Sequence, residues 1–126
     1  MSKRSGDNVQ NAVGTPPART SNLCNLLGPP RRRYAIEIII EKDEEITVRE
    51  LARRITAIEQ DIPIEHARGD PYRNVYTSLI QTHLDHMAKA GVVQYDSDRK
   101  VITAGESLED AWVLLQAIQE AQAEIL

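Results

Sequence analysis

Apolar and polar positions recur with a helical period between residues 70 and 93. Asp70 and Pro71 match the N-cap and first position of a helix, and Gly91 is typical of the residue that follows a helix end. At 100° per residue the segment has one apolar face, which consists of Tyr72, Tyr76, Leu79, Ile80, His83, Leu84, Met87 and Ala90. The pattern therefore predicts a single amphipathic helix over residues 70–90, about five turns long.

The opposite face of this helix is polar and consists of Asn74, Thr77, Ser78, Gln81, Thr82, Asp85 and Lys89. Short amide and hydroxyl side chains both donate and accept hydrogen bonds, as reading base edges in a major groove requires. The residues expected to address bases are Thr77, Ser78, Gln81 and Thr82. Asn74 and Lys89 are expected to address flanking positions or phosphates. The alternative is an ordinary solvated face, which Asp85 favours.

The remaining hydrophobic pattern predicts short elements around this helix. The expected order is a helical turn over 21–28, a helix over 30–42, a strand stub at Ile46, a helix over 48–61, a loop over 62–69, strands over 92–95 and 101–103, and a helix from 107 to 126. The segment 30–42 also suits a strand, but Pro30 at the first helical position favours a helix. The expected fold class is α+β, mostly helical: a winged helix-turn-helix with a C-terminal dimerisation helix.

The helix expected over residues 48–61 has a clear start signal. Thr47, with Glu50 three residues later, forms a capping box. The apolar positions expected to face the core are Leu51, Ala52, Ile55 and Ile58. The arginines expected to face solvent are Arg49, Arg53 and Arg54.

Charge is unevenly distributed. The net charge is −4, yet residues 1–33 carry six basic residues and one acidic residue. Residues 1–20 are also polar and aperiodic, so we expect a disordered basic arm. Residues 21–104 are then the winged-helix domain and residues 105–126 the C-terminal helix. A basic arm on an acidic body suggests an anionic partner, and a solubilising tail is the alternative.

The C-terminal helix has an apolar seam with alternating steps of three and four residues. The residues expected at its interface are Leu108, Ala111, Trp112, Leu115, Ile118 and Ile125. This face either packs on its own domain or pairs with a second copy, and a polar Gln122 within the seam would then fix the register. We prefer the homodimer, because two-fold symmetry sets two reading helices about one DNA turn apart.

Two groups of cations are candidate phosphate contacts. Arg31 and Arg32 lie at the start of the helix over 30–42, and Arg99 and Lys100 lie at the turn of the hairpin. A wing tip runs along the backbone or minor groove of DNA, which favours the second group. For the first group, ion pairing within the fold is equally suitable, with Glu37, Glu41 or Glu44 as partners.

Other chemistry finds little support. His83 and His86 are three residues apart, but no cysteine or acid completes a metal site, and the apolar face favours a hydrogen-bonded His83. Cys24 is the only cysteine, which fits a reducing cytoplasm. No apolar run reaches the roughly 18 residues of a membrane span. We therefore expect a cytoplasmic protein that is not an enzyme, with no cofactor, membrane partner or evident small-molecule ligand.

Three sequence pieces resemble a known family. They are LLG-x-x-RRR-Y at residues 26–34, T-x-x-E-L-A at 47–52, and V-Y-T-x-L-x-Q-T-H-L-x-x-M-x-x-A-G-V-V at 75–93. Together they resemble a haloarchaeal winged helix-turn-helix domain of unknown function. The third piece is also similar to ArsR-like repressors, with Met87 in place of a leucine. The resemblance covers residues 26–104 and implies a transcriptional regulator.

These patterns predict a homodimeric DNA-binding regulator whose helix over 70–90 enters the major groove of double-stranded DNA. The alternative is a winged-helix module that binds another protein through the same face or through the C-terminal helix. Salt dependence separates the two, because DNA binding weakens steeply as salt rises.

Overall fold

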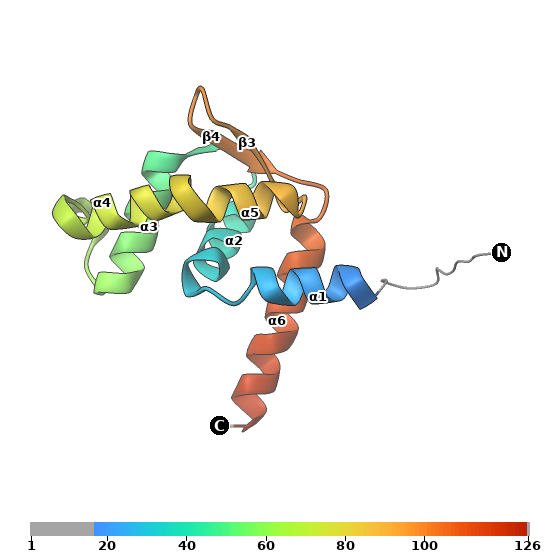
Figure 1. Ribbon diagram of the computed structural model, residues 1–126. Helices are drawn as coiled ribbons and strands as arrows, with labels where there is room; N and C mark the ends of the chain where they lie inside the picture. Colours follow the sequence, from blue (N-terminus) through green and yellow to red (C-terminus); the bar gives the residue numbers. More distant parts are fainter. Residues whose placement is uncertain (1–16, 126) are drawn as a thin grey trace.

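The computed structural model describes residues 17–125, with side chains described from residue 22 onward. The elements are α1 (Pro17–Leu26), α2 (Pro30–Lys42), β2 (Ile46–Thr47), α3 (Val48–Gln60), the 3-10 turn η2 (Ile64–His66), α4 (Gly69–Ser78), the π-helical segment η3 (Leu79–His83), α5 (Leu84–Lys89), β3 (Val93–Asp96), β4 (Val101–Ala104) and α6 (Leu108–Ile125) (Figure 1). The predicted class, α+β and mostly helical, is confirmed. Of the predicted arm, residues 1–16 lie outside the described residues, and residues 17–20 belong to α1.

Helix α2 forms where Pro30 opens its first turn, as predicted. Its buried residues are Arg32, Ala35, Ile36, Ile38 and Ile39. Arg33 has no glutamate partner among the described residues. Its Nη1 instead donates to the carbonyls of Leu27 and Gly28, at 2.8 and 2.7 Å, which ties α2 to the end of α1.

Helix α3 begins after Thr47, whose side chain caps it as predicted, whereas the Glu50 carboxylate pairs with Lys42 and Arg54. The Glu50 N–H donates to Thr47 Oγ1 at 3.0 Å, which satisfies one of the free amides of the first turn. Leu51, Ala52 and Ile55 are buried, as predicted. The prediction for Ile58 is wrong. Its side chain is 47% exposed, because the space beside it is an open groove towards Tyr34 and Trp112.

The helix predicted over residues 70–90 is continuous, but it is not a regular α-helix (Figure 1). At its centre the Leu84 N–H donates to the Leu79 carbonyl, five residues back, which is the spacing of a π turn. Val75 and Leu79 are buried four residues apart, Leu84 follows five residues later, and Met87 three later. The additional residue of the π turn keeps the apolar side chains of both halves facing the core.

The start and the apolar face of this helix differ from the prediction. The helix begins at Gly69 after Arg68, and no side chain caps its first turn. Asp70 is therefore no N-cap, and its carboxylate pairs with Arg73. Val75, which the regular wheel omitted, is buried, whereas His83 is only half-buried because the π turn rotates it towards the edge.

The strands form a small antiparallel sheet in the order β2-β4-β3. Ile102 lies at its centre and pairs with Ile46 on one side and Tyr95 on the other. The hairpin strands each end one residue later than predicted, and the first also begins one residue later. The Val48 N–H donates to the Lys100 carbonyl at 3.0 Å, so the hairpin turn is held beside the start of α3.

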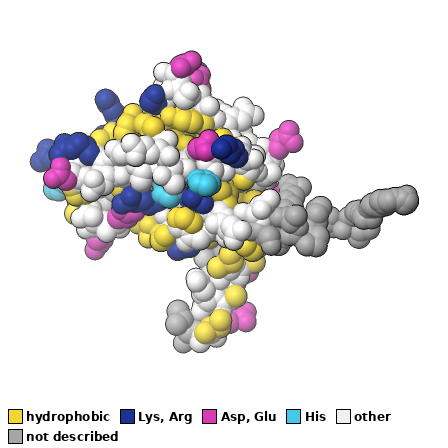
Figure 2. Space-filling view, in the orientation of Figure 1, with side chains coloured by type: hydrophobic (Ala, Val, Ile, Leu, Met, Phe, Trp, Pro, Cys, Tyr) yellow, Lys and Arg dark blue, Asp and Glu magenta, His cyan; other side chains and the backbone are white. Residues whose placement is uncertain are grey.

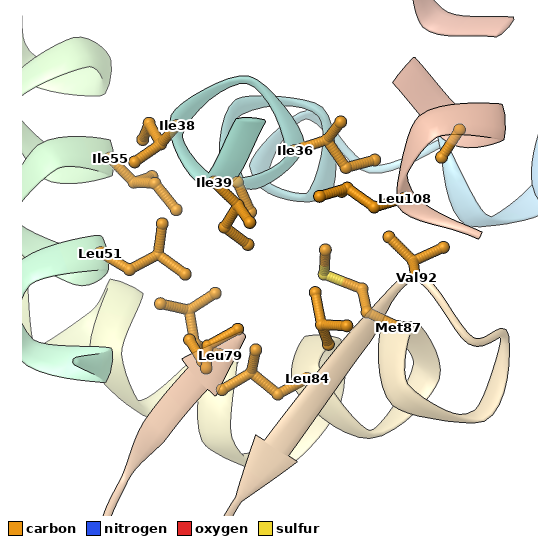
Figure 3. Packing of buried hydrophobic residues seen from close by; sticks show 14 of the residues in the cluster. Ile36, Ile38, Ile39, Leu51, Ile55, Leu79, Leu84, Met87, Val92 and Leu108 are labelled. Atoms are coloured by element: carbon orange, nitrogen blue, oxygen red, sulfur yellow. The ribbon is translucent and has the colours of Figure 1, made fainter. Parts of the chain in front are cut away.

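One hydrophobic core connects all of these elements. Figure 3 shows side chains from several helices and from the segment before β3 pointing towards one another: Ile36, Ile38, Ile39, Leu51, Ile55, Leu79, Leu84, Met87, Val92 and Leu108. This core fixes the α4–α5 helix on one side of the molecule, so its opposite side faces solvent.

Helix α6 divides into two parts. Leu108, Ala111 and Leu115 are buried in the chain's own core, because the first half of α6 packs on α2 and α1. These three residues of the predicted dimer seam are therefore not available to a partner, whereas Trp112 is only partly buried and lines the groove beside α2. The C-terminal half extends away from the body (Figure 1), with Ile118 partly buried and Ile125 83% exposed. Within residues 17–125, no helix has the length and apolar character that a membrane span needs.

Candidate nucleic-acid interface

The polar side chains singled out in the sequence lie on the outer side of the α4–η3–α5 helix. We define the polar face as the exposed residues Asn74, Thr77, Gln81 and Thr82. Among the described residues, none of these four side chains takes part in a hydrogen bond or an ion pair. Their donors and acceptors are therefore free to meet a ligand.

The charges on this helix are matched by close neighbours. Lys89 Nζ lies 3.1 Å from Asp85 Oδ2 in the last turns, and Asp70 pairs with Arg73 in the first. Both pairs are exposed and therefore weak. Residues 74–82 between them carry no charge. The polar face is thus an uncharged hydrogen-bonding surface, with a compensated acid–base pair at each end.

Ser78 is placed differently from the rest of its predicted group. Its Oγ donates to the Val75 carbonyl at 3.1 Å and accepts from Arg31 Nη1 at 3.0 Å. Arg31 in turn forms a bidentate pair with Glu59, through Nε at 2.6 Å and Nη2 at 3.0 Å. Hydrogen bonding to Glu59 raises the pKa of Arg31. Arg31 and Ser78, together with Glu59, therefore join α2, α3 and α4. The ion-pair partner of Arg31 is Glu59 and not one of the glutamates expected from the sequence, Glu37, Glu41 or Glu44.

Arg32 lies inside the protein. Its side chain is 8% exposed, and its Nε donates to His83 Nδ1 at 3.0 Å. Nη1 lies 3.4 Å from the Leu26 carbonyl. Burial lowers the pKa of Arg32, and burial together with the charge of Arg32 lowers the pKa of His83. The predicted contact of Arg32 with a DNA phosphate beside the polar face is therefore corrected, because the guanidinium is buried between α1, α2 and the π turn.

The hairpin turn carries the two cations expected at a wing tip. Arg99 lies 3.7 Å from Glu45 and 3.9 Å from Asp96, and Lys100 Nζ donates to the Ser97 carbonyl at 2.6 Å. The Asp96 carboxylate accepts from the backbone amides of Asp98 and Arg99, each at 3.1 Å, which shapes the turn. Both cations are exposed, but their field is reduced by the neighbouring acids.

A further cationic region lies where α4 begins. Arg68 and Arg73 flank the start of the helix, and Arg49 and Arg53 lie on the neighbouring α3. Figure 2 shows Lys and Arg side chains gathered at that end of the molecule. Arg53 donates to the Ile64 carbonyl at 3.1 Å, and it has no acidic partner among the described residues. Arg68 and Arg73 are not among the residues predicted from the sequence. The signal that could have identified them is their position, immediately before the helix start and one turn inside the helix.

His83 has a structural role. His83 is a hydrogen-bond acceptor for Arg32, which confirms the prediction of a hydrogen-bonded boundary histidine. Within residues 17–125, no group of three or more His, Cys, Asp or Glu side chains is arranged to hold a metal ion.

Comparison with known proteins yields one match. A family model described as a domain of unknown function, DUF7344, matches residues 24–103, which run from the end of α1 to β4. No curated protein and no solved structure matches the chain. The matched region includes the polar face and the hairpin, whereas α6 lies outside it. Since the match covers more than half of its length, this chain belongs to the DUF7344 family of domains of unknown function.

Proposed function

We propose that this protein is a DNA-binding transcriptional regulator of the winged-helix type. The α4–η3–α5 helix enters the major groove, and the β3–β4 hairpin acts as the wing, with Arg99 and Lys100 near the sugar–phosphate backbone. The observation that carries the proposal is the polar face: four exposed amide and hydroxyl side chains with unused hydrogen-bonding capacity, on a helix held rigidly by its opposite side.

The chemistry of the polar face favours A·T base pairs. Asn and Gln make paired hydrogen bonds with adenine, and the methyl group of Thr contacts the methyl group of thymine. Guanine is recognised mainly by Arg or Lys, and residues 74–82 contain neither. Phosphate contacts then come from the cations around this face, namely Arg68, Arg73, Lys89, Arg99 and Lys100.

We further propose that the active form is a cytoplasmic homodimer joined by the projecting half of α6. Ile118 is partly buried against the core, and Ile125, which is 83% exposed, continues the apolar seam beyond the body of the domain. A helical segment as short as the projecting half of α6 is only marginally stable in water without packing contacts, so pairing with a second copy would stabilise it. Two copies would then present two reading helices to a palindromic site. The resemblance in residues 26–104 suggests a haloarchaeal setting, in which high salt weakens phosphate contacts and direct readout matters more.

A protein-interaction module is the second candidate. One observation favours it: a groove of about 420 Å³ beside α2 is lined mainly by apolar side chains, among them Tyr34, Ile58 and Trp112, together with Glu37 and Glu41, and Ile58 is 47% exposed. A partner bound there would be held mainly by apolar contact. Its affinity would consequently change little with salt concentration.

Fluorescence anisotropy tests the first candidate. Wild-type protein is titrated onto the DNA upstream of its own gene and onto a scrambled duplex, at several salt concentrations. We expect selective binding with a steep negative slope of log affinity against log salt, about −0.9 for each phosphate neutralised. Gln81→Ala/Thr82→Ala should abolish the selectivity.

The matched control is Gln116→Ala/Gln119→Ala, which removes two exposed polar side chains from α6. This variant should bind as wild type does. If folded wild-type protein binds neither duplex at low salt, the regulator proposal is rejected and the interaction module takes its place.

A further inference from the structure

An open cavity with both apolar and polar lining lies between α1, α2 and α5, away from the polar face. Its volume is about 360 Å³, and its polar lining consists of Asn22, Asn25, Arg32, His86 and Lys89. No acidic side chain lines it. In a chain with a net charge of −4, a cavity lined by two cations, a histidine and two amides is chemically distinct from its surroundings.

Arg32 is the central residue of this cavity. Its side chain is 8% exposed, and its hydrogen bonds go to a histidine nitrogen and a backbone carbonyl, neither of which carries a negative charge. Among the described residues it has no ion pair, in contrast to Arg31 beside it, which is paired with Glu59. A buried charge is normally paired, because desolvation without a counter-charge is unfavourable.

The other lining groups suit the same ligand. Lys89 lies 3.1 Å from Asp85 through a pair that is exposed and therefore easily exchanged, so its ammonium can turn to a second anion. The side-chain amides of Asn22 and Asn25 supply N–H donors, and His86 supplies a ring nitrogen. Guanidinium, ammonium and amide donors together are the usual recognition set for carboxylate and phosphate oxygens.

We propose that this cavity binds a small oxyanion, a phosphate- or carboxylate-bearing molecule, with Arg32 as its principal counter-charge. The phosphate group could belong to a free small molecule or to the backbone of a nucleic acid, and the test below separates the two sources. The proposal does not depend on the regulator proposal: Lys89 takes part in both, but the anion titrations below are carried out without DNA.

The first test is thermal unfolding of the full chain in Tris–chloride, with inorganic phosphate or succinate added. At ten times its dissociation constant, either anion should raise the Tm by about 5 °C, and the rise should saturate. Sodium chloride of equal ionic strength is the reference, because phosphate also stabilises proteins non-specifically. A rise that never saturates, or that chloride reproduces, overturns the proposal.

Asn25→Asp provides the decisive variant. It places a carboxylate in the cavity, so the variant should have a higher Tm than wild type in anion-free buffer and should lose the saturable response to phosphate. Gln116→Glu makes the same change in charge on an exposed position of α6, and it should keep the wild-type Tm and response. An equal phosphate response in both variants contradicts the proposal.

A surface variant guards against misfolding of Asn25→Asp. Lys89→Gln alters a side chain that is 76% exposed, so it should fold normally. Its affinity for phosphate, measured by calorimetry, should fall several-fold. If Asn25→Asp does not fold and Lys89→Gln binds phosphate with wild-type affinity, the site is rejected. The source is identified by adding a DNA duplex to phosphate-loaded protein: release of phosphate on binding indicates a backbone phosphate, and retention indicates a free small molecule.

Discussion

The Nε of Arg32 donates a hydrogen bond to Nδ1 of His83 at 3.0 Å, which joins α2 to the π turn of the α4–α5 helix. Arginine has only donors, so His83 must offer the lone pair of Nδ1 and carry its proton on Nε2. The bond therefore requires a neutral His83. Because residues Gln81 and Thr82 of the polar face immediately precede His83, this bond also fixes the part of the helix that we propose reads DNA.

Stability should consequently depend on the protonation of His83. Its folded pKa lies below the ordinary 6.5, first because of burial and then because of Arg32, Arg31 and His86, while Glu59 opposes the shift. The unfolded state then binds more protons below about pH 6.5, so the free energy of unfolding should fall as pH drops from 6.5 to the folded pKa. Above pH 6.5 this contribution should be constant.

Denaturant unfolding of His83→Gln between pH 5 and pH 7.5 checks this expectation. The glutamine carbonyl can still accept from Arg32 but does not titrate, so the variant should lose part of the pH dependence. His66→Gln alters an exposed histidine and should retain the wild-type profile. Identical profiles for all three proteins would exclude His83 as the titrating group.

The capping box of α3 predicts a second measurable effect. Thr47→Ala removes the acceptor of the Glu50 N–H and should lower the free energy of unfolding by about 1 kcal/mol. Thr47→Ser keeps an oxygen at the same position and should recover most of this loss. Urea denaturation measures both, and equal losses in the two variants would show that the methyl group matters and the cap does not.

The two parts of α6 should respond differently to truncation of an apolar side chain. Leu115→Ala removes a fully buried side chain and should destabilise the monomer by about 2–5 kcal/mol. Ile125→Ala should change monomer stability by less than about 0.5 kcal/mol, but it should weaken self-association. Denaturation and sedimentation equilibrium measure the two effects. A monomeric wild type at micromolar concentration would contradict the proposed dimer.

The polar face predicts a base preference. Replacing an A·T pair contacted by Gln81 with G·C should weaken binding roughly 5- to 150-fold, which corresponds to about 1–3 kcal/mol for a paired hydrogen bond. Gln81→Ala should make the protein indifferent at that one position. Competition anisotropy with a set of single-pair substitutions measures this, and a preference for guanine at every contacted position would contradict the assignment.

Local signals in the sequence predicted much of this fold. Thr47 and Glu50 predicted the start of α3, and Pro30 predicted the start of α2. The polar turn over residues 96–100 predicted the hairpin. Each of these depends on neighbouring residues alone, because caps, prolines and turns act within a few positions of the chain.

Features that depend on distant residues were not predictable in this way. A regular helical wheel cannot reveal the π turn at Leu79–His83, which is needed to keep Leu84 and Met87 on the core side. Arg32 is one of three arginines in a basic run, yet α1 and the π turn bury it while Arg31 and Arg33 stay partly exposed. Ile58 fitted the apolar stripe of α3, but the fold leaves a groove beside it.

Mapping of the surface that contacts DNA tests the central proposal most directly. Backbone and side-chain amide signals of isotope-labelled protein are followed by NMR while the selected duplex is added. We predict shifts concentrated in residues 74–89 and 97–101, including the side-chain amides of Asn74 and Gln81, with α6 beyond residue 116 unchanged. Shifts confined to α6 and the groove around Ile58 and Trp112, with residues 74–82 unaffected, would contradict DNA reading by the polar face.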